Sequence, residues 1–362
     1  MDTILDLLDP QVLSSAYQQM QTTKPTLLGD TFLTNPEQIP GDSFELFIDP
    51  FESKPAPMNT PGAEARVIQA SGADSKVQTL FASFNKLAFS EKVMYALREP
   101  DSPTLQRQGR TEIRRQMEHF KARQMLTKEV ALAKILSVGT VYLNENGDIL
   151  ESSSGAVVSA DFNIAAGHKS QLDWDGGGDL ITASWATDGT SIATHIETIK
   201  IAAQKQGVPT PKHIWCNSNM KTHLRSNTEF QTWASASANI SEQTAAGETI
   251  QGLFGMTWHF YDGTYQNASG TETLLIPDNI AIFTPDPTDS VFRVTQGLTM
   301  VPSQIGVTAS IEEALGNLME VYGEYAYAKL TDDPIQLLAY MGDKWGFHLA
   351  DPNAIWIGTV VF

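Results

Sequence analysis

Apolar residues recur at helical spacing in three parts of the chain. Behind an Asp9-Pro10 start, apolar positions three and four apart predict a short helix over residues 10–20, capped by the aspartate. The strongest pattern covers about 102–138, where one stripe suits packing: Ile113, Met117, Phe120, Ala131 and Ile135. A third helix is predicted over 192–203, with Gly207 ending it. The first helix has little nearby sequence to pack on.

Alternating apolar and polar positions predict strands in the first hundred residues. Phe44 to Ile48 is one strand between prolines. Residues 65–70 and 77–84 predict a long hairpin whose tip is formed by Ser71, Gly72, Ala73 and Asp74. A two-stranded hairpin is marginal in water by itself, so we expect this one to lie on a partner surface.

From residue 140 onward, short strand patterns alternate with helix patterns. Residues 140–143 and 148–150 predict a hairpin around Asn146-Gly147, and the glycines at 176–178 suit a linker into an α/β second half. Further short apolar runs predict strands over 214–216, 256–261, 273–276, 280–284 and the final 355–362. Residues 311–321 predict an acidic helix, weakened by a glycine.

The long predicted helix is basic in an acidic protein. Residues 102–138 contain eight Lys and Arg against three Glu, whereas the whole chain of 362 residues has a net charge of −18. Five cations recur on one face, as Arg107, Arg110, Arg114, Lys121 and Lys128. This stripe is either an ordinary solvated helix face or a surface for a polyanion or an acidic neighbour, and the acidic stretch 145–179 could complement it.

Composition places the chain among soluble globular proteins. Its residues are 41% apolar and 18% charged, enough for a sizeable core in about two domains. The single cysteine excludes an internal disulfide. The acidic start lacks the basic region of a secretory signal, and no apolar stretch approaches the length of a membrane-spanning helix. The acidic total restricts nucleic-acid binding to local contacts.

The residue types used in catalysis or metal binding form no strong motif. Seven histidines include no HExxH pair, and His195 lies on an apolar helix face that favours packing. His213 is near Cys216, but a lone cysteine in a short apolar strand is typically buried. Residues 173–184 resemble a calcium loop that ends in Ser184 where a glutamate belongs. We predict no catalytic residue, no cofactor and no metal.

Four short stretches, in order along the chain, carry a family resemblance. Residues 38–41 (QIPG) precede the strand at 44–48, and residues 105–136 form the basic helix directly before the Asn-Gly hairpin. Residues 277–279 (PDN) lie between apolar strands, and residues 350–353 (ADPN) precede the last strand. Together they resemble the major capsid proteins of the lambda-like tailed-phage family, which share the Hong Kong 97-type capsid fold.

This resemblance implies an α+β fold with four parts. They are an N-terminal arm (1–43), an extended loop region (44–100), a peripheral domain with a long spine helix (101–184 and 341–362), and an α/β axial domain (185–340). The implied function is a major capsid protein that assembles into the icosahedral shell around phage double-stranded DNA.

The resemblance also implies partners and a location. The chain would form pentamers and hexamers with itself, work with a portal and with scaffold or decoration proteins, touch packaged DNA non-specifically, and contact no membrane. It would assemble in the host bacterial cytoplasm and reside in the virion capsid. The basic stripe would face either DNA or an adjacent subunit. The alternatives are a β-rich phage tail or adhesion protein and, less favoured, a metal-dependent enzyme.

Overall fold

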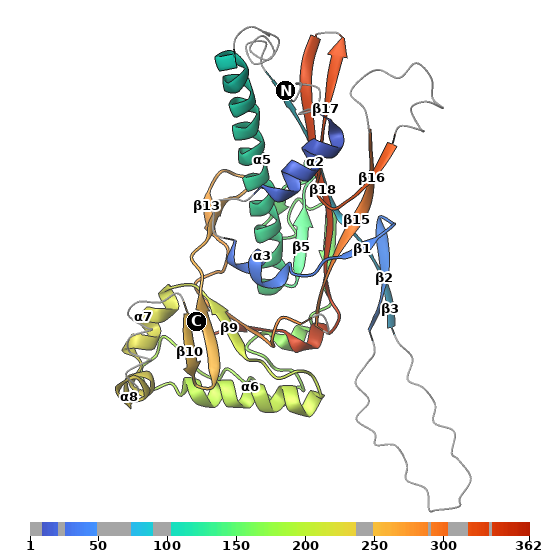
Figure 1. Ribbon diagram of the computed structural model, residues 1–362. Coiled ribbons are helices and arrows are strands. Elements are labelled where there is room, and N and C mark those ends of the chain that lie inside the picture. Colours follow the sequence, from blue (N-terminus) through green and yellow to red (C-terminus); the bar gives the residue numbers. More distant parts are fainter. Residues whose placement is uncertain are drawn as a thin grey trace, which may run out of the picture. The chain divides into compact units, whose positions relative to one another are not determined.

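The computed structural model describes residues 9–20, 26–48, 74–89, 103–236, 249–288, 291–302, 318–332 and 335–362 (Figure 1). Contacts within the chain divide it into two compact units. Unit 1 comprises Met1–Glu45, Val77–Lys128 and Val294–Phe347, and unit 2 comprises Leu46–Lys76, Glu129–Arg293 and His348–Phe362. The predicted limits of the arm, loop, peripheral and axial domains stay predictions.

A six-stranded sheet runs through unit 1. Its order is β1-β15-β18-β17, with β16 also paired to β15 and β4 to β18. The strands are β1 (Glu37–Ile39), β4 (Phe81–Ala88), β15 (Phe292–Pro302), β16 (Leu318–Tyr322), β17 (Tyr325–Asp332) and β18 (Ile335–Leu349). Strand β1 pairs with β15 in parallel, whereas the β15–β16, β17–β18 and β4–β18 pairs are antiparallel. The long β17–β18 ladder contributes Ala326, Ala339 and Met341 to the core.

The prediction of an acidic helix over 311–321 is wrong at its C-terminal end. Residues 318–322 form strand β16, because Leu318–Tyr322 pairs along β15 and gains ladder hydrogen bonds that an isolated short helix with a glycine cannot match. Residues 311–317 lie outside the described residues.

The first helix packs within its own chain. Helix α2 (Pro10–Gln19) begins at Asp9, whose carboxylate accepts hydrogen bonds from the backbone N–H groups of Gln11 and Val12, as the sequence predicts. Leu13 and Tyr17 are buried in the core of unit 1, and α2 lies beside β17 (Figure 1). The expectation that this helix has little to pack on is therefore wrong, because its partners come from distant sequence. The short helix α3 (Leu27–Phe32) follows.

The long helix is confirmed. Helix α5 spans Pro103–Ser137, close to the predicted 102–138. Its first part, to residue 128, belongs to unit 1, and its remainder belongs to unit 2. The predicted stripe is its packing face, since Ile113, Met117 and Ile135 are almost fully buried.

The extended loop region is described only at its base. Strands β2 (Ser43–Ile48) and β3 (Asp74–Thr79) form a two-stranded sheet, so the predicted strand at 44–48 is confirmed. The predicted strand at 77–84 is interrupted at Leu80, after which β4 begins and joins the unit 1 sheet. Of the predicted hairpin tip, Asp74 starts β3, whereas Ser71, Gly72 and Ala73 lie outside the described residues.

Unit 2 contains the predicted Asn-Gly hairpin. Strand β5 (Thr140–Leu143) pairs with β6 (Ile149–Leu150) on one side and with β7 (Val158–Asp161) on the other. Gly147 has φ +80°, which the turn requires and glycine adopts without strain. Strand β7 forms one edge of this three-stranded sheet.

The α/β part of unit 2 is built on a second six-stranded sheet, with order β10-β11-β9-β14-β19-β8. Its strands are β8 (Lys169–Ser170), β9 (His213–Cys216), β10 (Thr249–Leu253), β11 (Met256–Phe260), β14 (Ile280–Thr284) and β19 (Trp356–Thr359). The predicted strands at 214–216, 256–261 and 280–284 and the C-terminal strand are confirmed. Strands β12 (Thr264–Gln266) and β13 (Glu272–Leu274) form a separate pair.

Three helices complete unit 2. Helix α6 (Ile192–Gln206) starts at Ser191 and ends at Gly207, whose φ of +73° gives the predicted left-handed C-cap. Helices α7 (Asn219–Ser226) and α8 (Thr228–Ala236) follow. The core between α6 and the sheet holds large side chains that the structure buries almost completely: Trp185, Ile214, Trp258, Phe283 and Trp356. Among the described residues, no helix combines the length and apolar character needed to span a bilayer.

Candidate functional site

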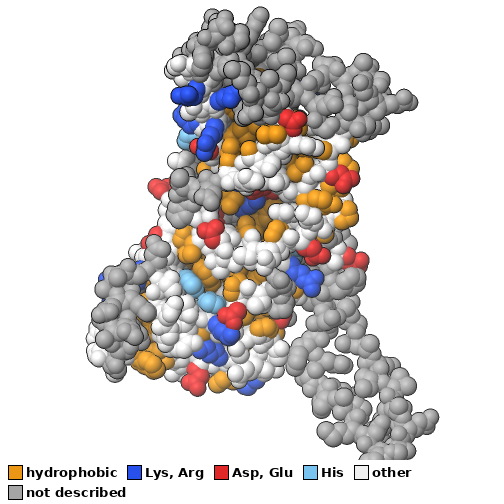
Figure 2. Space-filling view, viewed as in Figure 1, with side chains coloured by type: hydrophobic (Ala, Val, Ile, Leu, Met, Phe, Trp, Pro, Cys, Tyr) orange, Lys and Arg blue, Asp and Glu red, His pale blue; other side chains and the backbone are white. Residues whose placement is uncertain are grey.

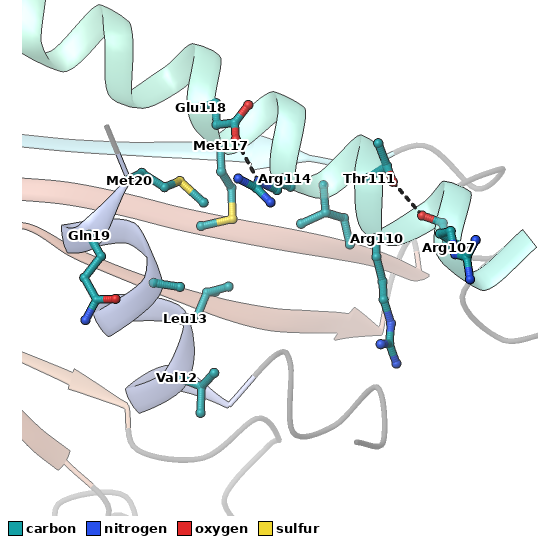
Figure 3. A pocket seen from close by; sticks show the side chains of 12 residues that line it. Val12, Leu13, Gln19, Met20, Arg107, Arg110, Thr111, Arg114, Met117 and Glu118 are labelled. Carbon is teal, nitrogen blue, oxygen red and sulfur yellow. Dashed lines mark hydrogen bonds and ion pairs between the residues drawn. The ribbon is translucent and has the colours of Figure 1, made fainter. Parts of the chain in front are cut away.

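A groove in unit 1 lies between α2 and the first half of α5 (Figure 3). Its volume is about 680 Å³. Buried Leu13, Ile113 and Met117 form an apolar floor, and Val12 stands at the edge with 49% of its surface exposed. The periodicity of both helices creates this floor, because each turns its apolar stripe toward the other.

Three arginines from α5 border the groove. Arg107, Arg110 and Arg114 are successive members of the predicted basic stripe, and Figure 3 shows Arg110 extending away from α5. Among the described residues of the lining, Glu118 is the single acid, and it forms an exposed ion pair with Arg114 at 2.8 Å. Figure 2 shows Lys and Arg side chains gathered beside a hydrophobic surface in this part of unit 1. The groove therefore combines an apolar floor with a positive rim.

The other two members of the stripe lie elsewhere. Lys121 and Lys128 are buried in a cluster of alternating charge with Glu324 and Asp343. Lys121 pairs with Glu324, and the Lys128 ammonium lies 2.9 Å from Glu324 and 2.6 Å from Asp343. These two lysines thus have acidic partners in their own chain, and the structure does not bring them together with the arginines of the groove.

Burial and charge act in opposite directions in this cluster. Burial alone would lower the pKa of Lys128, but Asp343 and Glu324 outweigh burial and raise it. Burial would raise the pKa of Glu324, but Lys128 and Lys121 outweigh burial and lower it. For Asp343 burial prevails and the pKa is raised. Since the two carboxylates and two ammonium groups balance, the cluster can stay charged inside unit 1.

The cluster connects three elements of unit 1. The ammonium of Lys121 donates to the backbone carbonyl of Tyr17 at 3.3 Å, and the Tyr17 hydroxyl donates to Gln124. The Ser14 hydroxyl donates to the carbonyl of Ala326 at 2.6 Å. Helix α2 is therefore fastened to α5 and to β17 by buried hydrogen bonds.

The histidines and the cysteine considered from sequence lie in unit 2. His213 contacts His259 at 3.0 Å and Asp286 at 3.1 Å, and burial together with His213 lowers the pKa of His259 to about 4. Cys216 is buried, and burial raises the pKa of its thiol. His195 accepts a hydrogen bond from the Trp185 indole at 3.0 Å.

The remaining candidate for metal chemistry is the glycine loop. In it, the carboxylates of Asp173 and Asp175 accept hydrogen bonds from the backbone N–H groups of Gly178 and Gly177. These carboxylates therefore stabilise the loop itself. Within the ranges that the structure describes, no group of three or more His, Cys, Asp or Glu side chains could hold a metal ion.

Sequence reasoning missed both partners of the basic helix. The groove floor needs α2, which begins more than eighty residues before α5 in the sequence. Glu324 and Asp343 lie about two hundred residues after the lysines that they bind. An acid within a strand otherwise rich in apolar and small residues, as at Asp343, is the one sequence signal that could have indicated a buried ion pair.

The fold and the site together define a class of protein. The chain has a long helix, a mainly antiparallel sheet, a separate α/β sheet and a groove with a positive rim. These features are typical of a protein that functions by binding other subunits. The sequence profile of the family described as phage major capsid protein E matches residues 9–296, and the chain belongs to this family. It is therefore a major capsid protein, the structural subunit of an icosahedral bacteriophage shell.

A solved structure agrees with this assignment at the level of the fold. A protein described as a prophage capsid protein from E. coli CFT073 is 14% identical, with a TM-score of 0.53, covering 92% of this chain and 93% of its own. A phage-related protein from Bordetella bronchiseptica RB50 is 11% identical, with a TM-score of 0.48 and 97% of both chains covered. Comparison with curated proteins gives no significant match.

These comparisons decide between the functions that the sequence left open. The resemblance to phage major capsid proteins and the expected Hong Kong 97-type fold are confirmed. The β-rich tail or adhesion protein and the metal-dependent enzyme are not favoured, because the family consists of major capsid proteins.

Proposed function

We propose that the chain assembles with copies of itself into pentamers and hexamers that close into a shell around double-stranded phage DNA. The α2–α5 groove carries this proposal. It sets half-exposed Val12 beside three arginines, above a buried apolar floor, in a protein whose net charge is −18. Binding of an acidic protein segment that covers the apolar part would stabilise such a surface most.

A protein neighbour suits the groove better than DNA does. DNA backbone binding rests on phosphate contacts to Lys and Arg and makes no use of an apolar floor. Two of the five cations of the stripe, Lys121 and Lys128, are buried in ion pairs, whereas the ion pair of Arg114 with Glu118 is exposed. We therefore propose that Arg107, Arg110 and Arg114 face an adjacent subunit, and that packaged DNA makes only weak, non-specific contacts with the shell.

The finer parts of the proposal follow the family resemblance. The loop region (44–100), with its tip at Ser71–Asp74, would lie on a neighbouring subunit, whereas helix α2 of the arm (1–43) packs within its own chain. The peripheral domain would be 101–184 with 341–362, and the axial domain 185–340 would approach the capsomer centre. Assembly would take place in the host bacterial cytoplasm, together with a portal and a scaffold or decoration protein.

Electron microscopy with size-exclusion chromatography tests the proposal directly. The chain is expressed alone and together with the genes beside it, and the particles are imaged. Closed shells of uniform size, or rings of five and six, are expected. A protein that stays monomeric under both conditions at high concentration would contradict the proposal.

A further inference from the structure

The three-stranded sheet of unit 2 exposes apolar side chains that a subunit would normally cover. Val157 and Val158 lie where strand β7 begins, with 63% and 54% of their surfaces exposed. Strand β7 is an edge strand, and β-branched residues at an exposed edge favour association with another chain. This surface, formed by β5 to β7 and their connections, is named the valine face below.

Acidic residues lie in the same three-stranded sheet as the two valines. Glu145 and Asp148 are exposed in the turn between β5 and β6, and no Lys or Arg occurs from residue 135 to residue 168. Asp148 accepts a local hydrogen bond, but a carboxylate has acceptor capacity for further donors. The valine face therefore combines exposed apolar side chains with an acidic turn.

The α2–α5 groove has the opposite character. Its floor is apolar, Val12 is half exposed at its edge, and its charged lining consists of three arginines and one glutamate. An exposed valine beside arginines and exposed valines beside an acidic turn are complementary in both charge and polarity. A nucleic acid would contact the arginines of the groove but leave Val12 without an apolar partner.

We propose that the valine face of one copy of this chain docks in the α2–α5 groove of a second copy. Val157 and Val158 would pack against Val12 at the edge of the groove, and Glu145 and Asp148 would face Arg107, Arg110 and Arg114. The two surfaces differ, so the contact is head-to-tail and can be repeated around a ring, as a capsomer requires. The inference rests on the proposed self-assembly and names the surfaces that mediate it.

Cysteine cross-linking between separately tagged chains tests the contact. Val12→Cys and Val157→Cys are placed in different chains, which are co-assembled and oxidised. The native Cys216 is buried and does not interfere. A disulfide-linked dimer carrying both tags is expected. The matched control pairs Val12→Cys with Ile201→Cys, an exposed position on α6 with 42% of its surface accessible against 63% for Val157, and should give at least tenfold less dimer.

A charge exchange tests the rims. Arg107→Glu with Arg114→Glu should raise the concentration needed for assembly at least tenfold, and so should Glu145→Lys with Asp148→Lys. The two sets combined in one chain should restore assembly toward the wild-type value, because attraction across the contact returns with its sign reversed. If DNA were the occupant of the groove, the variant with Arg107→Glu and Arg114→Glu would assemble poorly whichever residues occupy positions 145 and 148.

Failure of this inference differs from failure of the proposed function. Wild-type shells without a specific Val12–Val157 cross-link, and without rescue by the combined charge set, would overturn the docking of the valine face while leaving self-assembly intact. Absence of wild-type shells or rings would overturn the proposed function itself.

Discussion

Replacement of Glu324 by glutamine should destabilise unit 1 strongly. Glu324 is the one carboxylate that contacts both buried lysines, Lys121 and Lys128, and its side chain is only 13% exposed. In Glu324→Gln, two buried ammonium groups would share the single carboxylate of Asp343. Breaking a buried ion pair by removing one partner costs about 3–5 kcal/mol, because the remaining charge stays desolvated. That is a large fraction of the stability of an ordinary domain.

Urea denaturation of unassembled protein measures this effect. With a urea m value of about 3 kcal/mol/M, the expected loss lowers the unfolding midpoint by about 1–2 M. Near-ultraviolet circular dichroism is a suitable signal, since Lys128 lies over the ring of Trp345 at 5.9 Å. Glu118→Gln is the matched control, because it removes the exposed partner of Arg114 by the same chemical change and should leave the midpoint nearly unchanged.

A charge-balanced variant distinguishes the effect of an unpaired buried charge from the effect of losing a side chain. Lys121→Met combined with Glu324→Leu removes one charge of each sign and leaves the Lys128–Asp343 pair at 2.6 Å. Apolar replacement of a complete buried pair is often neutral, so this double variant should be more stable than Glu324→Gln. The reasoning is refuted if Glu324→Gln unfolds at the same urea concentration as Glu118→Gln.

Three other changes probe packing, backbone approach and pH. Leu13→Ala should cost about 2–4 kcal/mol in urea denaturation, and an unchanged midpoint would show that α2 does not pack on unit 1. Gly342→Ala should lower the melting temperature, because the added Cβ would lie 2.3 Å from the Tyr325 ring and 2.7 Å from the backbone oxygen of Ser83; a wild-type value would contradict this contact. Burial lowers the pKa of His348 to about 3, so the unfolded chain binds a proton below about pH 6.5 that the folded chain does not. Stability should therefore fall from pH 6.5 toward pH 3, and His348→Gln, measured over the same range, should flatten this dependence or the assignment is wrong.

Local patterns predicted most helices and strands because their causes are local. The Asp9 cap and Pro10 fix the start of α2, Gly207 fixes the end of α6, and Gly147 allows the hairpin turn. The 3.6-residue period of α5 is sustained over so many turns that no strand pattern competes with it. Element type and approximate bounds follow from such signals without tertiary information.

Long-range pairing was not predictable in the same way. Strand β16 forms because β15 offers it a ladder, and nothing within residues 311–322 indicates that partner. Likewise, the sequence shows five regularly spaced cations on α5 but gives no sign that Lys121 and Lys128 meet Glu324 and Asp343 while the three arginines do not. A charged stripe on a helix therefore predicts a polar face and leaves its partners undetermined.

The buried position of α2 changes where assembly contacts should be sought. An arm that completed its core on neighbours would leave Leu13 and Tyr17 exposed in one chain, yet both are buried against unit 1 of the same molecule. Among the described residues, the exposed apolar side chains available for association include Val12 at the edge of the α2–α5 groove and Val157 and Val158 on the valine face. Since one surface is bordered by arginines and the other by acids, each copy can offer both halves of a repeated contact. Different residues then stabilise the folded chain and mediate assembly of the shell. The charge exchange at the rims should therefore alter assembly without altering the stability of unit 1.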